Sequence, residues 1–217
     1  MPAEAASSPK WRRRSEHRPD EILDAALVEF ERVGFDAARV EDIAQKAGIS
    51  KAGVYLYFDT KDAILRGLIE REVAPVARRF RKLAEMNIDD PAIALRMLIT
   101  AIVSFTGDRA HFAVPRIVLS VASRYPDIAA YYRENVVDQV MEAVRTLHSA
   151  GVDMGVFRPG DSTAAARAVI GPLFVYGFYT HLLGGDPGPV DDVHRMTAHE
   201  DILFNGLLTE RELCARR

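Results

Sequence analysis

Cysteine is almost absent from this chain of 217 residues, in which Cys214 is the only one. A single thiol cannot form an internal disulfide, so the fold has to hold together without covalent cross-links. This composition suits a reducing compartment, and we expect a cytoplasmic location.

Long apolar runs are missing as well. No stretch is long enough to span a bilayer, and the first residues lack the apolar segment of a signal peptide. We therefore expect no membrane partner. The remaining composition, 48% hydrophobic and 27% charged residues, excludes a wholly disordered chain. Its length allows one large or two small domains.

The net charge is small, at −3, which argues against a uniformly basic nucleic-acid binder. The basic residues are unevenly placed, however. Lysine and arginine crowd residues 10–18, where only Glu16 opposes them. We interpret residues 1–17 as a disordered basic arm. It either contacts DNA phosphates and the minor groove, as homeodomain arms do, or is a solvated charge run.

Catalytic and metal-binding patterns are also missing. No Ser-His-Asp set, carboxylate pair or phosphate-binding loop stands out. His194 and His199 do not have the i, i+4 spacing of a helical metal site. We therefore predict no enzyme activity, no cofactor and no metal.

The most informative stretch is residues 40–59, which reads as two short helices joined by a tight turn. One apolar stripe at i, i+3, i+4 and i+7 marks the first helix and consists of Val40, Ile43, Ala44 and Ala47. Gly48 follows where a helix ends and a positive φ is needed. Ser50 can cap the second helix, which carries Val54 and Phe58 inward.

With its flanks, this stretch resembles the TetR family of transcriptional regulators over residues 34–65. The matching motifs occur in a fixed order and are Ile43-Ala44, Ala47-Gly48-Ile49-Ser50, Tyr55-Leu56-Tyr57-Phe58 and Lys61-Asp62. The resemblance implies an all-α protein. Residues 18–70 would form a three-helix, helix-turn-helix DNA-binding domain, and residues 71–217 a helical-bundle domain for ligand binding and dimerisation.

The resemblance also assigns the DNA contacts. Lys51, Ala52 and Gly53 would face the bases or let the helix approach them. Tyr55, Tyr57 and Lys61 would hold phosphates. Arg39 departs from the family, which commonly has a capping Thr or Ser at this position. It either contacts phosphate or is solvated.

Lys61 carries an argument of its own. A cation in the first turn of a helix is unfavourable against the helix dipole, unless an anion sits there too. We therefore expect a phosphate beside Lys61, and the alternative is an ordinary surface lysine.

Helices are predicted along the rest of the chain. Pro75 and Pro115 each interrupt a helical pattern, so we expect kinks near residues 71–75 and 111–115. Ala150-Gly151 is expected to close the long helix before it. The predicted helices span about residues 19–33, 61–83, 91–105, 109–125, 127–149, 162–183 and 195–208.

The last two helices carry more apolar surface than a lone helical layer needs. The resemblance implies that they pair with a second subunit, and the alternative is that they fill the core of their own chain. A two-fold dimer would read a palindromic operator with half-sites roughly 34–36 Å apart. The expected interface residues are Tyr179, Leu182, Ile202, Leu203 and Gly206.

Between the kinked helices we expect an apolar cavity. Its candidate residues are also compatible with ordinary core packing. They are Met97, Phe105, His111, Phe112, Met141, Phe174 and Phe178.

These patterns and the resemblance together predict a DNA-binding transcriptional regulator, and the resemblance implies a homodimeric repressor that a small apolar or aromatic ligand releases from double-stranded DNA. Two alternatives stay open. One is a regulator of the same fold that a protein partner switches, with the cavity filled. The other is a helical enzyme that has lost DNA binding.

Overall fold

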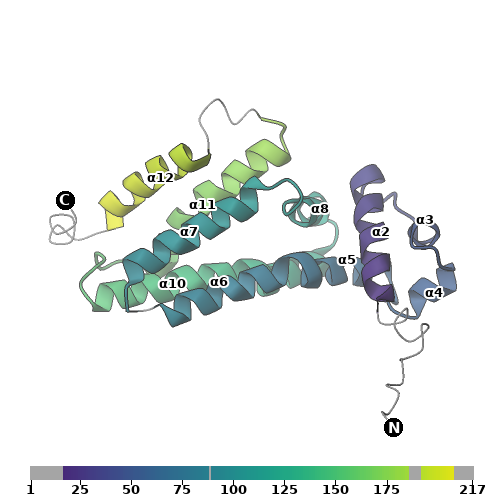
Figure 1. Cartoon of the computed structure of the whole chain (residues 1–217), viewed down its shortest axis with the longest axis horizontal. Coiled ribbons are helices and arrows are strands. Elements are labelled where there is room, and N and C mark those ends of the chain that lie inside the picture. The colour runs from purple at the N-terminus through teal and green to yellow at the C-terminus, as the bar shows by residue number, and fades with distance from the viewer. Residues whose placement is uncertain (1–16, 88, 186–191, 208–217) are drawn as a thin grey trace, which may run out of the picture. The chain divides into compact units, whose positions relative to one another are not determined.

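The computed structural model describes residues 17–87, 89–185 and 192–207 (Figure 1). Within these ranges the chain forms helices and no β-strand, which confirms the all-α prediction. The predicted basic arm falls almost wholly on residues 1–16, which lie outside the described ranges. The chain divides into two compact units between Leu68 and Ile69.

The first unit contains four described helices. They are α2 (Arg18–Val33), α3 (Val40–Lys46), α4 (Lys51–Tyr55) and α5 (Lys61–Leu68). α2 packs against α3 and α5, and α3 packs against α4. Phe30 of α2 meets Phe35 edge-on, with ring centroids 5.1 Å apart, and both side chains are buried. Phe35, which follows the end of α2, thus belongs to the small core of this unit.

Local signals set the turn between α3 and α4 as the sequence predicted. Gly48 has a φ of +67°, which is costly for residues with a Cβ. The Oγ of Ser50 accepts a hydrogen bond from the backbone N of Gly53 at 3.1 Å and so caps α4. Thr60 caps α5 in the same way, through the backbone N of Ala63 at 3.0 Å.

One buried carboxylate joins α2 to α3. Glu29 is fully buried, and its Oε1 lies 2.5 Å from Nη2 of Arg32. Its Oε2 lies 3.5 Å from Nζ of Lys46. The hydrogen bond from Arg32 lowers the pKa of Glu29, so the carboxylate stays charged and paired. The helix that precedes the turn is thereby held to α2 by an ion pair as well as by apolar packing.

The second unit is a helical layer structure with two π-helical segments. Its described elements are η1 (Ile69–Val73), α6 (Ala74–Met86), α7 (Pro91–Gly107), α8 (Ala113–Val121), α9 (Pro126–Tyr132), η2 (Arg133–Val137), α10 (Asp138–Asp153), α11 (Ser162–His181) and α12 (Asp192–Leu207). α10 packs on α6 and α11, and α7 contacts all three. α12 lies against α7 and contributes Leu203 and Phe204 to the core.

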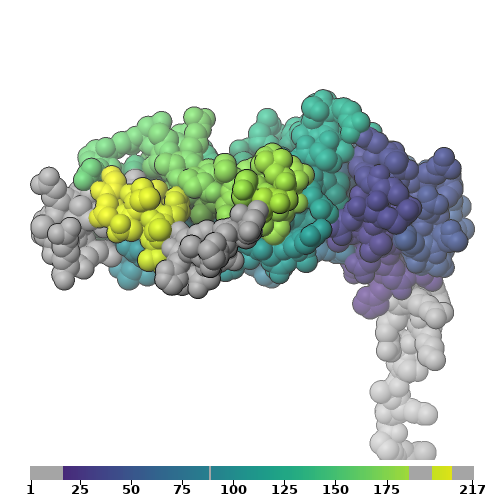
Figure 2. All heavy atoms as spheres, turned by 90° about the horizontal axis from the view of Figure 1, so that it is seen from above, coloured from purple at the N-terminus to yellow at the C-terminus, as the bar shows by residue number. Residues whose placement is uncertain are grey.

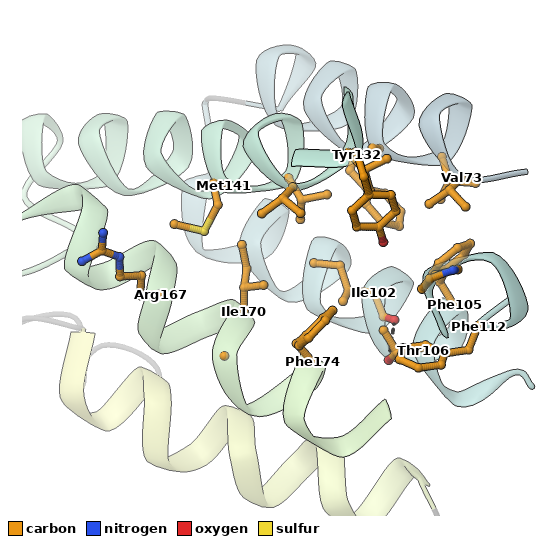
Figure 3. Close-up of a pocket in the computed structure, with 18 residues that line it drawn as sticks. Val73, Ile102, Phe105, Thr106, Phe112, Tyr132, Met141, Arg167, Ile170 and Phe174 are labelled. Carbon is orange, nitrogen blue, oxygen red and sulfur yellow. Dashed lines mark hydrogen bonds between the residues drawn. The ribbon is translucent and has the colours of Figure 1, made fainter. Parts of the chain in front are cut away.

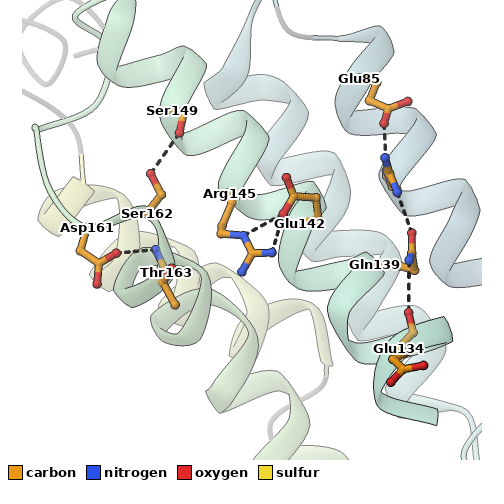
Figure 4. A network of polar contacts seen from close by, with 10 residues as sticks. Glu85, Glu134, Gln139, Glu142, Arg145, Ser149, Asp161, Ser162 and Thr163 are labelled. Atoms are coloured by element: carbon orange, nitrogen blue, oxygen red, sulfur yellow. Dashed lines mark hydrogen bonds and ion pairs between the residues drawn. The ribbon is translucent and has the colours of Figure 1, made fainter. Parts of the chain in front are cut away.

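Polar contacts tie α6 to α10 at the surface of this unit. Arg81 donates to Glu85 at 3.0 Å and to Gln139 at 3.1 Å (Figure 4). Gln139 in turn donates to the carbonyl oxygen of Glu134 in η2 at 3.2 Å. No helix in the described ranges combines the length and apolarity that a bilayer span requires.

The two proline predictions have different outcomes. Before Pro75 the chain adopts the π-helical segment η1, and Pro75 then stands in the first turn of α6, so the expected irregularity is present. The expected helix from Arg109 is wrong. α8 begins only at Ala113, which places Pro115 in its first turn, where a missing N–H breaks no helical bond. Pro115 therefore starts a helix and does not kink one.

The expected closure at Ala150-Gly151 is also wrong, because α10 continues to Asp153. A Cβ on Gly151 would lie 2.1 Å from the ring of Phe157. The glycine therefore serves close packing inside the helix. Gly155, with a φ of +72°, makes the turn that follows. Sequence reasoning assigned the break to the wrong glycine.

Candidate functional site

α4 presents an exposed surface in the first unit. Val54 faces the core and is fully buried, whereas Leu56 is 82% exposed. Tyr55 and Tyr57 are about two-fifths exposed. Exposed aromatic and aliphatic side chains are unusual on one short segment and indicate a binding surface. Tyr55 in α4 and Tyr57 just after it, both predicted to contact DNA, are thus accessible to a partner.

Lys51 and Ala52, at the start of α4, are exposed too. The Nζ of Lys51 lies 2.5 Å from Oε1 of Glu41 on α3 and 5.9 Å from the ring centroid of Tyr55. The hydrogen bond between them raises the pKa of Lys51 and lowers that of Glu41. In the free protein, the carboxylate of Glu41 therefore pairs with the ammonium group of Lys51, which was predicted to reach the bases.

Gly53 is not required by the internal packing of α4. A Cβ at this position would meet Oγ of Ser50 at 3.4 Å, which is an ordinary contact. Gly53 does not have a positive φ. The fold could accept a larger residue here, so glycine is not needed for packing. The missing side chain leaves room for another molecule to approach the helix closely. This is compatible with the predicted close approach to DNA.

Arg39 is exposed and stands at the N-cap of α3 with extended backbone, and its side chain makes no capping bond. Its guanidinium is thus available at the edge of the helix-turn-helix. Contact with phosphate stays a prediction.

Lys61 has a different environment from the one its sequence position suggested. Its Nζ donates to the carbonyl oxygens of Phe35 at 2.6 Å, Asp36 at 3.0 Å and Ala38 at 3.0 Å. These bonds engage all three donors of the ammonium group. Lys61 therefore needs no phosphate beside it, because carbonyl oxygens of the α2–α3 connection stabilise its charge. Partial burial lowers its pKa.

The second unit contains a largely apolar cavity with a volume of about 340 Å³. Its lining comes from η1, α6, α7, α8, α9, η2, α10 and α11 (Figure 3). Arg167 lies at one end in this view, and Phe112 lies at the other. The volume is within the range of small-molecule sites.

The cavity contains some of the predicted residues. Phe105, Phe112, Met141 and Phe174 line it. The other three predicted residues do not, because the sequence does not say which side of each helix faces the cavity.

Met97, His111 and Phe178 do not line the cavity. Met97 is 47% exposed on α7. His111 is exposed and stacks on the ring of Phe105, with centroids 5.2 Å apart. Phe178 lies one turn beyond Phe174, past the point where Phe112 packs against Gly177.

Sequence reasoning missed the part of the lining that comes from the two π-helical segments. Val73 belongs to η1, Val136 and Val137 belong to η2, and Tyr132 immediately precedes η2. A cluster of apolar residues at 132, 136, 137 and 140 was visible in the sequence. It reads equally well as the core face of a regular helix, so the sequence contained no distinguishing signal.

The cavity has few polar groups. Oγ1 of Thr106 donates to the carbonyl oxygen of Ile102 at 2.9 Å. Tyr132 is 8% exposed, and burial raises the pKa of its phenol. Arg167 is exposed. The site can therefore hold a mostly apolar molecule with very limited polar contact.

The predicted dimer residues divide into two groups. Tyr179 is 48% exposed, Ile202 is 75% exposed and Gly206 is exposed, whereas Leu182 is half-buried. The prediction that Leu203 lies in the interface is corrected, because its side chain is only 8% exposed and packs in the core of its own chain. Val175 and Leu183 on and beside α11, which were not predicted, are more than three-fifths exposed. α11 and α12 both reach the surface seen in Figure 2.

Comparisons with known proteins agree with these features. Residues 22–68 match bacterial regulatory proteins of the tetR family, and residues 93–204 match the C-terminal domain of AefR-like transcriptional repressors. The uncharacterized HTH-type transcriptional regulator YfiR of Bacillus subtilis (strain 168) is 29% identical over 154 residues, which cover 70% of this chain and 74% of YfiR. The HTH-type transcriptional repressor NicS of Pseudomonas putida is 27% identical over 168 residues, which cover 76% and 77% of the two chains.

Among solved structures, the SmeT–triclosan complex has a TM-score of 0.72 to this chain at 22% identity. The match covers 89% of this chain and 92% of SmeT. Similarity at this level of identity shows a shared fold.

Proposed function

Because this chain belongs to the TetR family and is a DNA-binding transcriptional regulator, we propose that it is a homodimeric repressor that a small, mostly apolar ligand releases from its operator. The observation that carries this proposal is the cavity of about 340 Å³ inside the second unit. A protein that is switched only by a protein partner has no need for such a space, because close packing of the core is more stable.

The proposed domains follow closely the division of the chain into two compact units between Leu68 and Ile69. Residues 18–70 read DNA and residues 71–217 bind ligand and form the dimer. The cavity wall includes Val73 of η1, and η1 begins at the residue that follows α5. A ligand that changes η1 therefore acts on the segment by which the two parts are covalently joined. Release requires that the ligand prefer a conformation with low DNA affinity.

The proposed dimer rests on the exposed apolar faces of α11 and α12. Val175, Tyr179 and Ile202 expose large apolar side chains that a monomer has no reason to keep in water. A two-fold interface places two recognition helices on a palindromic site. The proposed DNA contacts are Arg39, Lys51, Ala52, Gly53, Tyr55 and Tyr57. Lys61 is left out for the reason given above.

The test is selection of bound sequences from a random DNA pool, followed by competition with a library of apolar and aromatic compounds. We expect a palindromic site and at least one compound that releases it. Selection of a site that no compound releases, while a protein from the same cells does, would contradict the ligand-responsive proposal. Absence of any selected site would contradict DNA reading itself.

A further inference from the structure

The cavity wall contains a hydroxyl group that makes no hydrogen bond in the described part of the chain, on a side chain that is mostly buried. Tyr132 is 8% exposed, and Figure 3 shows its hydroxyl pointing into the cavity, toward Ile102 and Thr106. A hydroxyl that faces an otherwise apolar space can bond a ligand that enters it, and that bond offsets the cost of removing the hydroxyl from water.

The other polar groups of the cavity are already accounted for. Thr106 uses its single proton on the carbonyl oxygen of Ile102, so it cannot also donate to a ligand. Arg167 is exposed to solvent at one end of the cavity and needs no further partner there. Aspartate and glutamate are absent from the described lining. The phenol of Tyr132 is thus the buried donor that is left.

The surroundings of this donor decide what it can bind. Apolar side chains surround it, and burial raises the pKa of the phenol, which therefore stays protonated and neutral. A single neutral donor cannot compensate the desolvation of a carboxylate or phosphate at this depth. It can satisfy one neutral oxygen acceptor. A wholly apolar ligand would leave the hydroxyl unsatisfied.

Resting on the function proposed above, we infer that the effector is a neutral hydrophobic molecule with one oxygen acceptor, such as a ketone, ester, lactone or amide carbonyl. The acceptor binds the Tyr132 hydroxyl, and the remaining body fills the space beside Phe80, Met141 and Phe174. Tyr132 is thereby the specificity-determining residue of the cavity.

The test uses the full chain and three matched probes, with dissociation constants measured by calorimetry. Butyrophenone carries a carbonyl, butylbenzene replaces that carbonyl with a methylene, and 4-phenylbutanoate carries an anion. We expect Tyr132→Phe to weaken butyrophenone about 3- to 10-fold, the effect of one hydrogen bond, and to leave butylbenzene unchanged.

Tyr131→Phe is the matched control. It removes the neighbouring hydroxyl, which donates to Oε1 of Glu70 at 2.7 Å and does not line the cavity. We expect it to leave the ratio of the two affinities unchanged. Thermal melting supplies the folding control, because Tyr132→Phe removes a hydroxyl that makes no hydrogen bond in the described part of the chain and should melt close to the parent temperature.

The outcomes separate this inference from the proposed function. Equal effects of Tyr132→Phe on both neutral probes would overturn the inference, while binding of the probes would still support a ligand-responsive regulator. Tightest binding of 4-phenylbutanoate, with loss in Arg167→Gln, would overturn it in favour of an anionic effector. Failure of all three probes to bind the parent would also overturn the inference, whereas the proposed function is tested separately by release of the selected operator.

Discussion

Lys61 and Phe35 meet in the first unit, where Nζ of Lys61 lies 2.6 Å from the carbonyl oxygen of Phe35 and 4.7 Å from its ring centroid. The same ammonium group bonds the carbonyl oxygens of Asp36 and Ala38. A side chain from the start of α5 thus anchors the connection between α2 and α3. Its role is to hold together the helices that position α4.

Lys61→Met should therefore lower the free energy of unfolding by about 1–3 kcal/mol, because carbonyl groups lose a charged donor. The dependence of DNA affinity on salt should keep its slope. Arg39→Ala is the matched comparison: we expect unchanged stability and a slope smaller by about 1, the effect of one lost phosphate contact. A slope reduced by Lys61→Met in a stable variant would restore Lys61 to the DNA surface.

The two glycines of the helix-turn-helix should respond in opposite ways. Gly48→Val should cost about 1–3 kcal/mol, because φ is +67° there. Gly53→Ala should be neutral or stabilise by up to about 1 kcal/mol, since the added Cβ makes ordinary contacts and alanine favours a helix. We also expect Gly53→Ala to weaken DNA binding. Denaturant unfolding and DNA titration of both variants measure these effects.

Glu41→Gln should strengthen DNA binding, by about 2- to 5-fold at low salt, because it removes the exposed ion-pair partner of Lys51. Glu31→Gln, an exposed site on α2, controls for the change in net charge alone. If both variants gain the same affinity, the effect is one of overall charge and Lys51 has no special part in it.

Acidification should destabilise the second unit through His148. This side chain is 2% exposed, and its Nδ1 lies 3.0 Å from Oγ of Ser162, which joins α10 to α11. Burial lowers the pKa of His148 below its ordinary value of 6.5, so the unfolded chain takes up the proton more readily than the folded one. Stability is then fully present above about pH 6.5 and is lost as the pH falls toward the lower, folded-state pKa.

The melting temperature as a function of pH measures this effect. His148→Gln should flatten the profile between about pH 7 and 5, in the range where histidine titrates. His111→Gln, at an exposed site, should leave it as in the parent. A profile that stays steep in His148→Gln would assign the loss of stability to other groups.

The helix-turn-helix was predictable because its signals are local. Gly48 and Ser50 each act on backbone within a few residues, and the structure contains both the turn and the cap that they predict. Lys61 was misread because its partners lie more than twenty residues earlier in the chain. Proximity of this kind depends on how the helices pack, which a local pattern does not encode.

The cavity was predictable only in part for the same reason. Its walls combine elements that are distant in sequence, and the hydrophobic pattern of α7 and α11 covers more than one face. Met97 and Phe105 are therefore equivalent candidates in the sequence, although only Phe105 lines the space. The π-helical segments change the direction in which the side chains of Val73, Val136 and Val137 point relative to a regular helix. No short sequence motif indicates such segments.

Ile202 offers the most direct test of the proposed dimer. It is 75% exposed on α12, next to Leu203, which is buried in the core of its own chain. Ile202→Glu would place a charge in the proposed interface without disturbing that core, so we expect a folded monomer with normal helical content. Light scattering measures the mass, and the monomer should bind palindromic DNA much more weakly than the parent does.

Ile93→Glu is the matched control, because Ile93 is 51% exposed on α7, a helix outside the proposed interface. It introduces the same charge into the same unit and should remain a dimer. If Ile202→Glu also remains a dimer, α12 does not form the interface, and the exposed side chains of α11 alone would have to carry it. Val175→Glu then decides the matter, since Val175 is 62% exposed in the C-terminal half of α11. A dimer that survives both substitutions would refute the proposed arrangement.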